Sequence, residues 1–265
     1  MEKVKDVVFR IQRYNKEKGT WWDEYKIPVY KGMTILDGLI YIKENLDGTL
    51  TFRASCRMGA CGSCAVFVNG KPMMACQTQI LHLNSDKIKI QPLPNYPVIK
   101  DLVVDRDKLF ENHKKVKPYL IREEFEENKP IEFLQTPEEH LEYLRFTYCF
   151  KCGACLSACP TCATDEEFLG PQALTQAYRY SIDTRDNGWK ERIAVLDTTH
   201  GVWKCHFATA CSDACPKGVD PALAIQLLKK AIIFNKFKKK KIAPKAPPYK
   251  GKRKEGIPNP PEPTV

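Results

Sequence analysis

Residues 149–162 read Cys149-Phe-Lys-Cys152-Gly-Ala-Cys155-Leu-Ser-Ala-Cys159-Pro160-Thr-Cys162. Three cysteines spaced three positions apart, followed by a fourth cysteine and a proline, are typical of a loop that wraps a cubane iron–sulfur cluster. In proteins with two such clusters the fourth cysteine binds the other cluster, so a second run must exist. It follows downstream as Cys205, Cys211 and Cys215-Pro216. The two reciprocal runs predict two interlocked cluster sites.

The twelve cysteines of this 265-residue chain all fall in three tight groups. A secreted disulfide protein of this length would spread its bridges and would begin with a signal peptide. Here the N-terminus alternates apolar and charged residues, and no apolar run approaches the length of a membrane span. We therefore interpret the thiols as metal ligands in a reducing compartment, in a chain of one to two domains.

The first cysteine group has the spacing Cys-x4-Cys-x2-Cys with a distant fourth member, which is the plant-type 2Fe–2S pattern. Its glycines, Gly59 and Gly62, would let backbone amides turn toward the cluster sulfurs. A four-cysteine zinc site is the alternative, but zinc sites usually pair two separated Cys-x2-Cys units, which the four-residue gap fits poorly. The group consists of Cys56, Cys61, Cys64 and Cys76.

Hydrophobic periodicity divides the chain into two halves. Residues 4–14 and 21–30 alternate like strands, Thr34 can cap a helix, and a hairpin turns at Asn69-Gly70. The proline-rich residues 92–97 mark the boundary, and from Asp101 the period becomes helical. We predict helices from that point, from Thr136-Pro137, from Gly170-Pro171 to Ile182, and from Pro221 to about Phe234. The predicted class is α+β: an N-terminal β-grasp (plant-type 2Fe–2S ferredoxin) domain at 1–98, a C-terminal all-α two-cluster ferredoxin domain at 99–234, and a basic, proline-rich tail at 235–265.

This order of modules resembles the iron–sulfur subunit of succinate dehydrogenase and fumarate reductase, the complex II family. Further matching text includes Phe168-Leu-Gly-Pro-Gln-Ala, Asp183-Thr-Arg185-Asp186, Cys205-His206 and Cys215-Pro-Lys217-Gly. The resemblance implies that the first group holds a 2Fe–2S cluster. It implies Cys149, Cys152, Cys155 and Cys215 as ligands of a 4Fe–4S cluster, and Cys159, Cys205 and Cys211 as ligands of a third cluster, commonly 3Fe–4S.

The resemblance also implies a function. Such a subunit passes single electrons between a flavoprotein subunit, where succinate and fumarate interconvert, and quinone at membrane-anchor subunits of a respiratory complex. The sequence lacks Gly-x-Gly-x-x-Gly, so FAD is expected on the partner and no catalytic residue on this chain. We expect a peripheral subunit at the cytoplasmic face of the cell membrane. An iron–sulfur subunit of a thiol-linked fumarate reductase shares these modules and is an alternative.

Two features of the third site leave alternatives open. Pro160 and His206 are candidates for quinone contact, although His206 packing against cluster sulfur is an equal alternative. The tryptophans usual after this Cys-Pro in ubiquinone-reducing relatives are replaced by Thr161 and Cys162, so a menaquinone-type acceptor suits as well. Ala208 stands where a fourth ligand would fall, which favours three irons. Cys162 could instead complete a second 4Fe–4S site.

Positive charge is concentrated in the tail. Residues 236–265 carry ten Lys and Arg against two Glu, which leaves only +2 of the total +10 for the rest. Such a segment suits anionic lipid, a partner subunit or plain solvation. No nucleic acid is expected, because aromatic residues are not interleaved with the basic ones. A metal-stapled, non-redox binding protein is the alternative from another class, and it would be colourless whereas iron–sulfur protein is brown.

Overall fold

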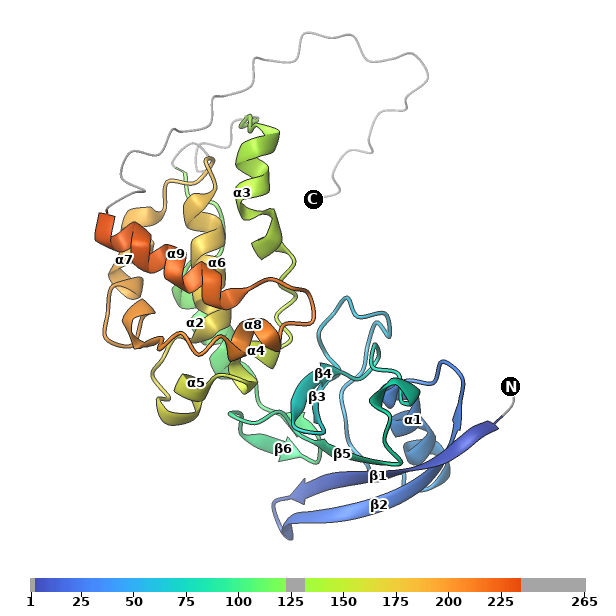
Figure 1. Cartoon of the computed structure of the whole chain (residues 1–265). Coiled ribbons are helices and arrows are strands. Elements are labelled where there is room, and N and C mark those ends of the chain that lie inside the picture. Colours follow the sequence, from blue (N-terminus) through green and yellow to red (C-terminus); the bar gives the residue numbers. More distant parts are fainter. Residues whose placement is uncertain (1–2, 123–131, 235–265) are drawn as a thin grey trace, which may run out of the picture.

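The computed structural model describes residues 3–122 and 132–234, and its N-terminal half is built on one mixed sheet. The sheet order is β2-β1-β5-β3-β4, in which β1 pairs antiparallel with β2 and parallel with β5 (Figure 1). A helix packed on such a sheet is the β-grasp arrangement, so the predicted class is confirmed for this half. The strands are β1 (Lys3–Asn15), β2 (Gly19–Tyr30), β3 (Ala65–Val68), β4 (Lys71–Met74) and β5 (Lys87–Gln91).

Helix α1 (Ile35–Asn45) begins where the sequence predicted it. The Thr34 hydroxyl accepts from the Asp37 amide, while the Asp37 carboxylate accepts from the Thr34 amide, which forms a capping box. Its buried face lies on the sheet so closely that a Cβ at Gly38 would stand 2.6 Å from the Phe9 ring. The short η1 (Leu81–Leu83) leads into β5.

The prediction of helix from Asp101 onward is wrong for its first residues. The structure has a small hairpin there, β6 (Val98–Lys100) and β7 (Val103–Val104), and α2 (Asp107–Lys115) begins later. The cause is the buried Asp101, whose positive φ of 48° turns the chain and whose carboxylate accepts from Arg13 and from the Thr51 amide. An apolar run of strand was mistaken for the start of a helical period.

The C-terminal half is helical. Its principal pair is α6 (Gly170–Ile182) with α9 (Pro221–Phe234), and α3 (Pro137–Thr147) starts at a second capping box made by Thr136 and Glu139. These three helices were predicted, as was the Thr136 cap of α3. The remaining elements, short except for α7, were not: α4 (Ala154–Ser157), α5 (Pro160–Thr164), α7 (Trp189–Leu196), η3 (Val202–Lys204) and α8 (Ala210–Asp213).

The two halves pack directly against each other (Figure 1). Cys152 and Ala154, although they belong to the helical half, are buried in the same apolar cluster as the sheet and α1. The proline-rich segment between the halves also binds the helical half: the Asn95 side-chain amide lies within 3.0–3.1 Å of the carbonyls of Leu156, Ser157 and Cys159. The boundary region is therefore anchored to the helical half through Asn95.

Candidate cluster-binding sites

The first cysteine group converges on the loop between α1 and β3, together with the turn after β4. The amides of Ala60 and Cys61 lie 3.3 Å from Cys56 Sγ and donate to it. The Cys76 amide donates to Cys64 Sγ at 3.4 Å, because the β3–β4 hairpin returns the chain beside that cysteine. Amides directed at cysteine sulfur are the surroundings that an iron–sulfur thiolate requires. The donor set and its amides therefore fit a 2Fe–2S cluster.

The four sulfurs of this group differ in their exposure to solvent. Cys61 is exposed, and a hydrogen bond from the Ser63 side chain, followed by backbone donors, lowers the pKa of its thiol to about 6. Burial raises the pKa of Cys64 to about 12, and the nearby Cys76 and Cys61 sulfurs add to that shift. The mutual repulsion of these sulfurs as thiolates is what a bound iron ion relieves. The loop presents one face to solvent, where Met58 is 74% exposed.

A second set of cysteines lines one small cavity in the helical half. It is formed by Cys149, Cys152, Cys155 and Cys215, so the sequence-distant Cys215 does join the first run. Burial raises the pKa of Cys152 to about 11, with the charges of Cys149 and Cys215 contributing. The Val219 amide donates to Cys215 Sγ at 3.4 Å. Four convergent thiols with backbone donors are a donor set that fits a cubane cluster.

The third set lines a separate cavity between α5, α8 and α9. Its sulfurs are Cys159, Cys205 and Cys211, and Pro160, His206 and Ala208 share the same walls. Burial raises the pKa of Cys211 to about 12, with the charges of Cys159 and Cys205 contributing. His206 is exposed beside Cys205, and the neighbouring Phe207 is 53% exposed. This site opens toward solvent on the side of His206.

Cys162 does not line this third cavity. It borders another cavity, of about 350 Å³, together with Tyr96, Leu109 and Leu156. A hydrogen bond from the Cys162 thiol lowers the pKa of Cys159 to about 6, and the same bond raises the pKa of Cys162 far above its usual range. The neighbouring Cys162 thiol therefore favours the thiolate form of Cys159. Cys162 thus lies beside Cys159 of the third set but does not line the third cavity itself.

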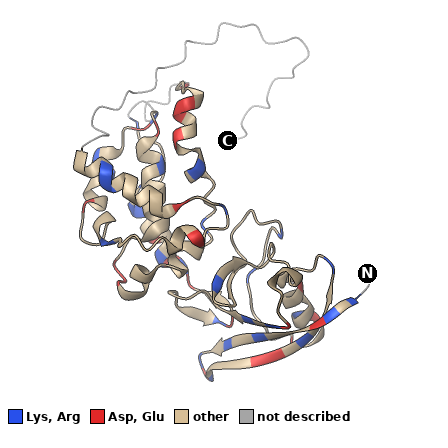
Figure 2. Ribbon diagram, in the orientation of Figure 1, with Lys and Arg blue, Asp and Glu red and all other residues tan. Residues whose placement is uncertain are grey.

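The elements around the cysteine loops carry little charge (Figure 2). Among α4, α5 and α8, Asp213 is the sole charged residue. Within the described ranges, no three His, Cys, Asp or Glu side chains are grouped as they would be around a single metal ion. The second and third cysteine sets instead line two separate small cavities.

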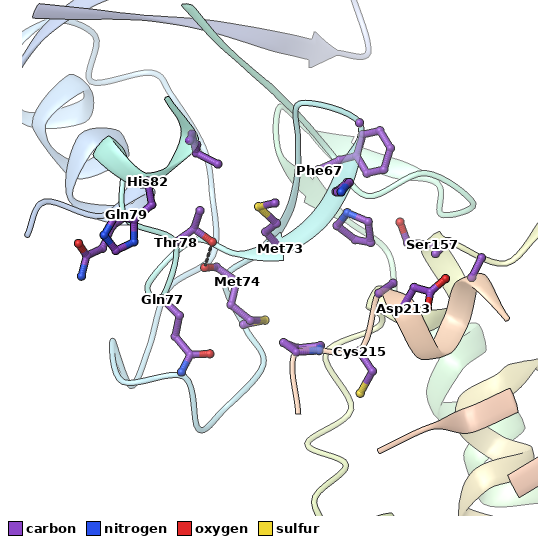
Figure 3. A pocket seen from close by; sticks show the side chains of 18 residues that line it. Phe67, Met73, Met74, Gln77, Thr78, Gln79, His82, Ser157, Asp213 and Cys215 are labelled. Atoms are coloured by element: carbon purple, nitrogen blue, oxygen red, sulfur yellow. Dashed lines mark hydrogen bonds between the residues drawn. The ribbon is translucent and has the colours of Figure 1, made fainter. Parts of the chain in front are cut away.

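A groove of larger volume lies elsewhere. It has a volume of about 760 Å³ and separates the β3–β4 hairpin, with Met73 and Met74, from α8, with Asp213 (Figure 3). Cys215 stands at its edge (Figure 3). The volume of a pocket thus does not identify the functional sites of this chain, because the second and third cysteine sets line smaller cavities than this groove.

Sequence reasoning missed residues that connect the cluster sites. Arg106 donates to the carbonyls of Gly62 and Ser63, and Tyr96 donates to the carbonyl of Gly153 at 3.1 Å. Gly62 lies so close to the next loop that a Cβ on it would stand 2.9 Å from Cys152 Cα. None of these residues belongs to a cysteine motif. The available signal was the unusual Asn95-Tyr96 pair between the prolines, and it was interpreted only as a boundary.

Comparisons with known proteins agree with this geometry. Residues 8–111 match a family described as a 2Fe-2S iron-sulfur cluster binding domain, and residues 145–219 match a 4Fe-4S dicluster domain. The fumarate reductase iron-sulfur subunit of Mycobacterium tuberculosis is 42% identical over 235 residues, which cover 88% of this chain and 95% of the relative. The mitochondrial succinate dehydrogenase [ubiquinone] iron-sulfur subunit of Candida glabrata is 38% identical and covers 86% and 91%.

A solved structure shares the fold. A chain of the Mycobacterium smegmatis Sdh1 complex in the apo form superposes with a TM-score of 0.79 at 23% identity and covers 88% of this chain and 98% of that one. The fold and its cysteine-lined sites define an iron–sulfur electron carrier with 2Fe–2S and 4Fe–4S clusters. More particularly, the chain belongs to the family of iron–sulfur subunits of fumarate reductase and succinate dehydrogenase.

Proposed function

We propose that this chain carries single electrons along three adjacent cluster sites, between a flavoprotein that interconverts succinate and fumarate and a quinone at the membrane. The ligand sets that we assign are Cys56, Cys61, Cys64 and Cys76 for 2Fe–2S, Cys149, Cys152, Cys155 and Cys215 for 4Fe–4S, and Cys159, Cys205 and Cys211 for the third cluster. Iron–sulfur clusters supply one-electron transfer and offer no open position for C–H chemistry. The dicarboxylate chemistry and the FAD are therefore assigned to the partner.

The observation that carries this proposal is the close succession of the three sites. The first and second loops meet where Gly62 abuts Phe150 and Cys152. The second and third sites adjoin, since the charge of Cys211 acts on Cys155. The two outer sites reach solvent, at Met58 and at His206, whereas Cys155 is buried between them. This arrangement suits a carrier that exchanges electrons with a different partner at each end.

We assign the two ends to different partners. The exposed Cys61 loop would face the flavoprotein, and the third site, with His206 and Pro160, would face the membrane-anchor subunits and the quinone. An exposed histidine can hydrogen-bond a quinone oxygen or hold a proton for it. The chain's own contribution there is the imidazole beside Cys205, on a surface that Phe207 makes partly apolar.

For the third site we propose a 3Fe–4S cluster. Three cysteines line the cavity, Ala208 stands on its wall where a fourth ligand would be expected, and Cys162 borders a different cavity. The Cys162 thiol donates to Cys159, which is a role for an additional cysteine that does not bind iron. A second 4Fe–4S cluster would require Cys162 to turn away from Leu156 and into the third cavity.

We propose a peripheral location at the cytoplasmic face of the membrane. Among the described residues, no helix has both the length and the apolar character needed to cross a bilayer. The basic tail, residues 235–265, lies outside the described residues, and we assign it to contact with lipid or a partner subunit. Deleting residues 236–265 should weaken attachment most at low salt, where charge is least screened. Equal attachment of both proteins throughout a salt series would contradict this assignment.

We place the domain boundary near residue 98, although the matched 2Fe-2S family extends to residue 111.

The decisive experiment is an anaerobic redox titration of the intact complex followed by electron paramagnetic resonance (EPR). We expect 2Fe–2S and 4Fe–4S signals on reduction and a three-iron signal on oxidation. Cys61→Ala should remove the 2Fe–2S signal and leave the other two. Loss of all three signals in that variant, or a colourless wild-type protein, would refute the assignment.

A further inference from the structure

Arg106 is a buried cation at the junction of the first two cluster sites. It lies directly before α2 and is only 9% exposed. Its two terminal nitrogens donate to consecutive carbonyls of the first cysteine loop, at 3.1 Å to Gly62 and at 2.9 Å to Ser63. Its Nε is buried and has no hydrogen-bond partner in the described part of the chain. The Nε donor of the guanidinium therefore has no acceptor among the described residues near the cluster loops.

This arginine has no carboxylate partner among the described residues, unlike the buried Arg13 and Arg192, which pair with Asp101 and Asp186. Burial lowers the pKa of Arg106, and the charges of Tyr96, Cys152 and Cys64 oppose that shift. A buried cation is costly unless anions lie nearby. Among the groups that oppose the shift, Cys64 belongs to the first cluster site and Cys152 to the second.

The same arginine also lies beside the contact between the two loops. The Gly62 carbonyl accepts from Arg106, and the Gly62 backbone abuts the backbone of Phe150 and Cys152. A positive charge at this point acts on both sites at short range. In a poorly solvated interior such an interaction is much stronger than in water.

Building on the ligand sets assigned above, we propose that Arg106 is the electrostatic and positioning residue that couples the 2Fe–2S and 4Fe–4S sites. A cluster held by four thiolates is an anion, and reduction adds one further negative charge. A neighbouring cation stabilises the reduced form more than the oxidised form, so it raises the reduction potential. Arg106 therefore raises the potentials of both sites together and holds the loop contact through which the electron passes between them.

The test is an anaerobic redox titration, followed by EPR, of the intact complex carrying Arg106→Gln, Arg106→Lys or the control Arg53→Gln. Arg53 also acts on Arg106, but it is exposed, so its charge is screened by water. We expect Arg106→Gln to shift the potentials of the 2Fe–2S and 4Fe–4S clusters to more negative values and to leave the third cluster unchanged. Arg106→Lys keeps the charge, so its potentials should stay close to those of the wild type, and Arg53→Gln should shift the potentials less than Arg106→Gln.

The magnetic interaction between the two reduced clusters provides a second measurement. It depends on their separation, so we expect it to weaken in Arg106→Lys, which loses the two-pronged hydrogen bond although it keeps the charge. Unchanged potentials in Arg106→Gln, an equal shift at all three clusters, or a shift in Arg106→Lys as large as in Arg106→Gln would overturn the proposal. Absence of the two signals in the wild-type complex would instead contradict the proposed function. If Arg106→Gln fails to load iron, the lysine variant still decides.

Discussion

Replacing Gly62 with alanine should separate the first two cluster loops. Gly62 has a φ of +72°, and an added Cβ would stand 2.8 Å from the Phe150 carbonyl oxygen and 2.9 Å from Cys152 Cα. Both of these atoms belong to the backbone of the other half of the protein, so no side-chain rotation can relieve the overlap. Gly70 is a matched control, because it has a φ of +85° in the β3–β4 turn with nothing within 4 Å of the added Cβ.

The two variants share one cost and differ in another. An alanine held at positive φ lowers the free energy of unfolding by about 1–2 kcal/mol, and this loss of stability should occur in both variants. Forcing an extra carbon into a packed contact lowers the free energy of unfolding by about a further 1–3 kcal/mol, and this loss should occur only in Gly62→Ala. At about 1.4 kcal/mol per factor of ten, that difference corresponds to about 5-fold to about 150-fold in the unfolding equilibrium.

The assay is the rate at which visible absorbance is lost in urea under anaerobic conditions, since proteins that lose a cofactor on unfolding are compared by rate. We expect Gly62→Ala to bleach fastest, with Gly70→Ala between it and wild type. EPR of the reduced complex should show weaker coupling between the first two clusters in Gly62→Ala alone. Equal bleaching of the two variants, with unchanged coupling, would show that the loops are not in contact in the holoprotein.

Three further outcomes are expected. Asn95→Ala removes a side-chain amide that faces three carbonyls and should destabilise the complex by about 1–3 kcal/mol, measured as faster bleaching in urea; bleaching at the wild-type rate would contradict that anchoring role. Burial lowers the pKa of His113 from 6.5 to about 4, so the unfolded chain binds the proton first and stability should fall as the pH drops from about 6.5 toward 4. His113→Gln should lose this part of the pH dependence, and identical pH profiles of bleaching would argue against it. Cys162→Ser should keep the oxidised three-iron signal; a variant that gains this signal where wild type lacks it would make Cys162 a ligand.

The cysteine spacing was enough to predict the modules, their order and the position of Cys215 beside the first run. The reason is chemical: ligands of one cluster are confined to short loops, so the spacing along the chain reflects the geometry of the site. The capped helices were predictable for a similar reason, since the signals at Thr34 and Thr136 are local hydrogen bonds within four residues. Cys215 could be placed because the pattern of two interlocked runs requires it.

Contacts between distant residues were not predictable. Arg106 reaches Gly62 across 44 positions, and nothing in the local sequence distinguishes it from a surface arginine. The β6–β7 hairpin was mistaken for helix because Leu102, Val103 and Val104 suit either period, and the decision rests on Asp101, which is buried by Arg13 from β1. Both failures concern buried charges, whose partners are brought together only by the tertiary fold.

The approach of Gly62 to Cys152 limits how this protein can be re-engineered. Ferredoxin domains are often treated as exchangeable parts, and a chimera could join the sheet half of one relative to the helical half of another. In this chain the joint contains a glycine that tolerates no side chain, an arginine that donates to the carbonyl of that glycine, and an asparagine that donates to carbonyls at the end of α4 and just after it. A hybrid should keep its clusters only when all three residues and both loops are inherited from a single parent.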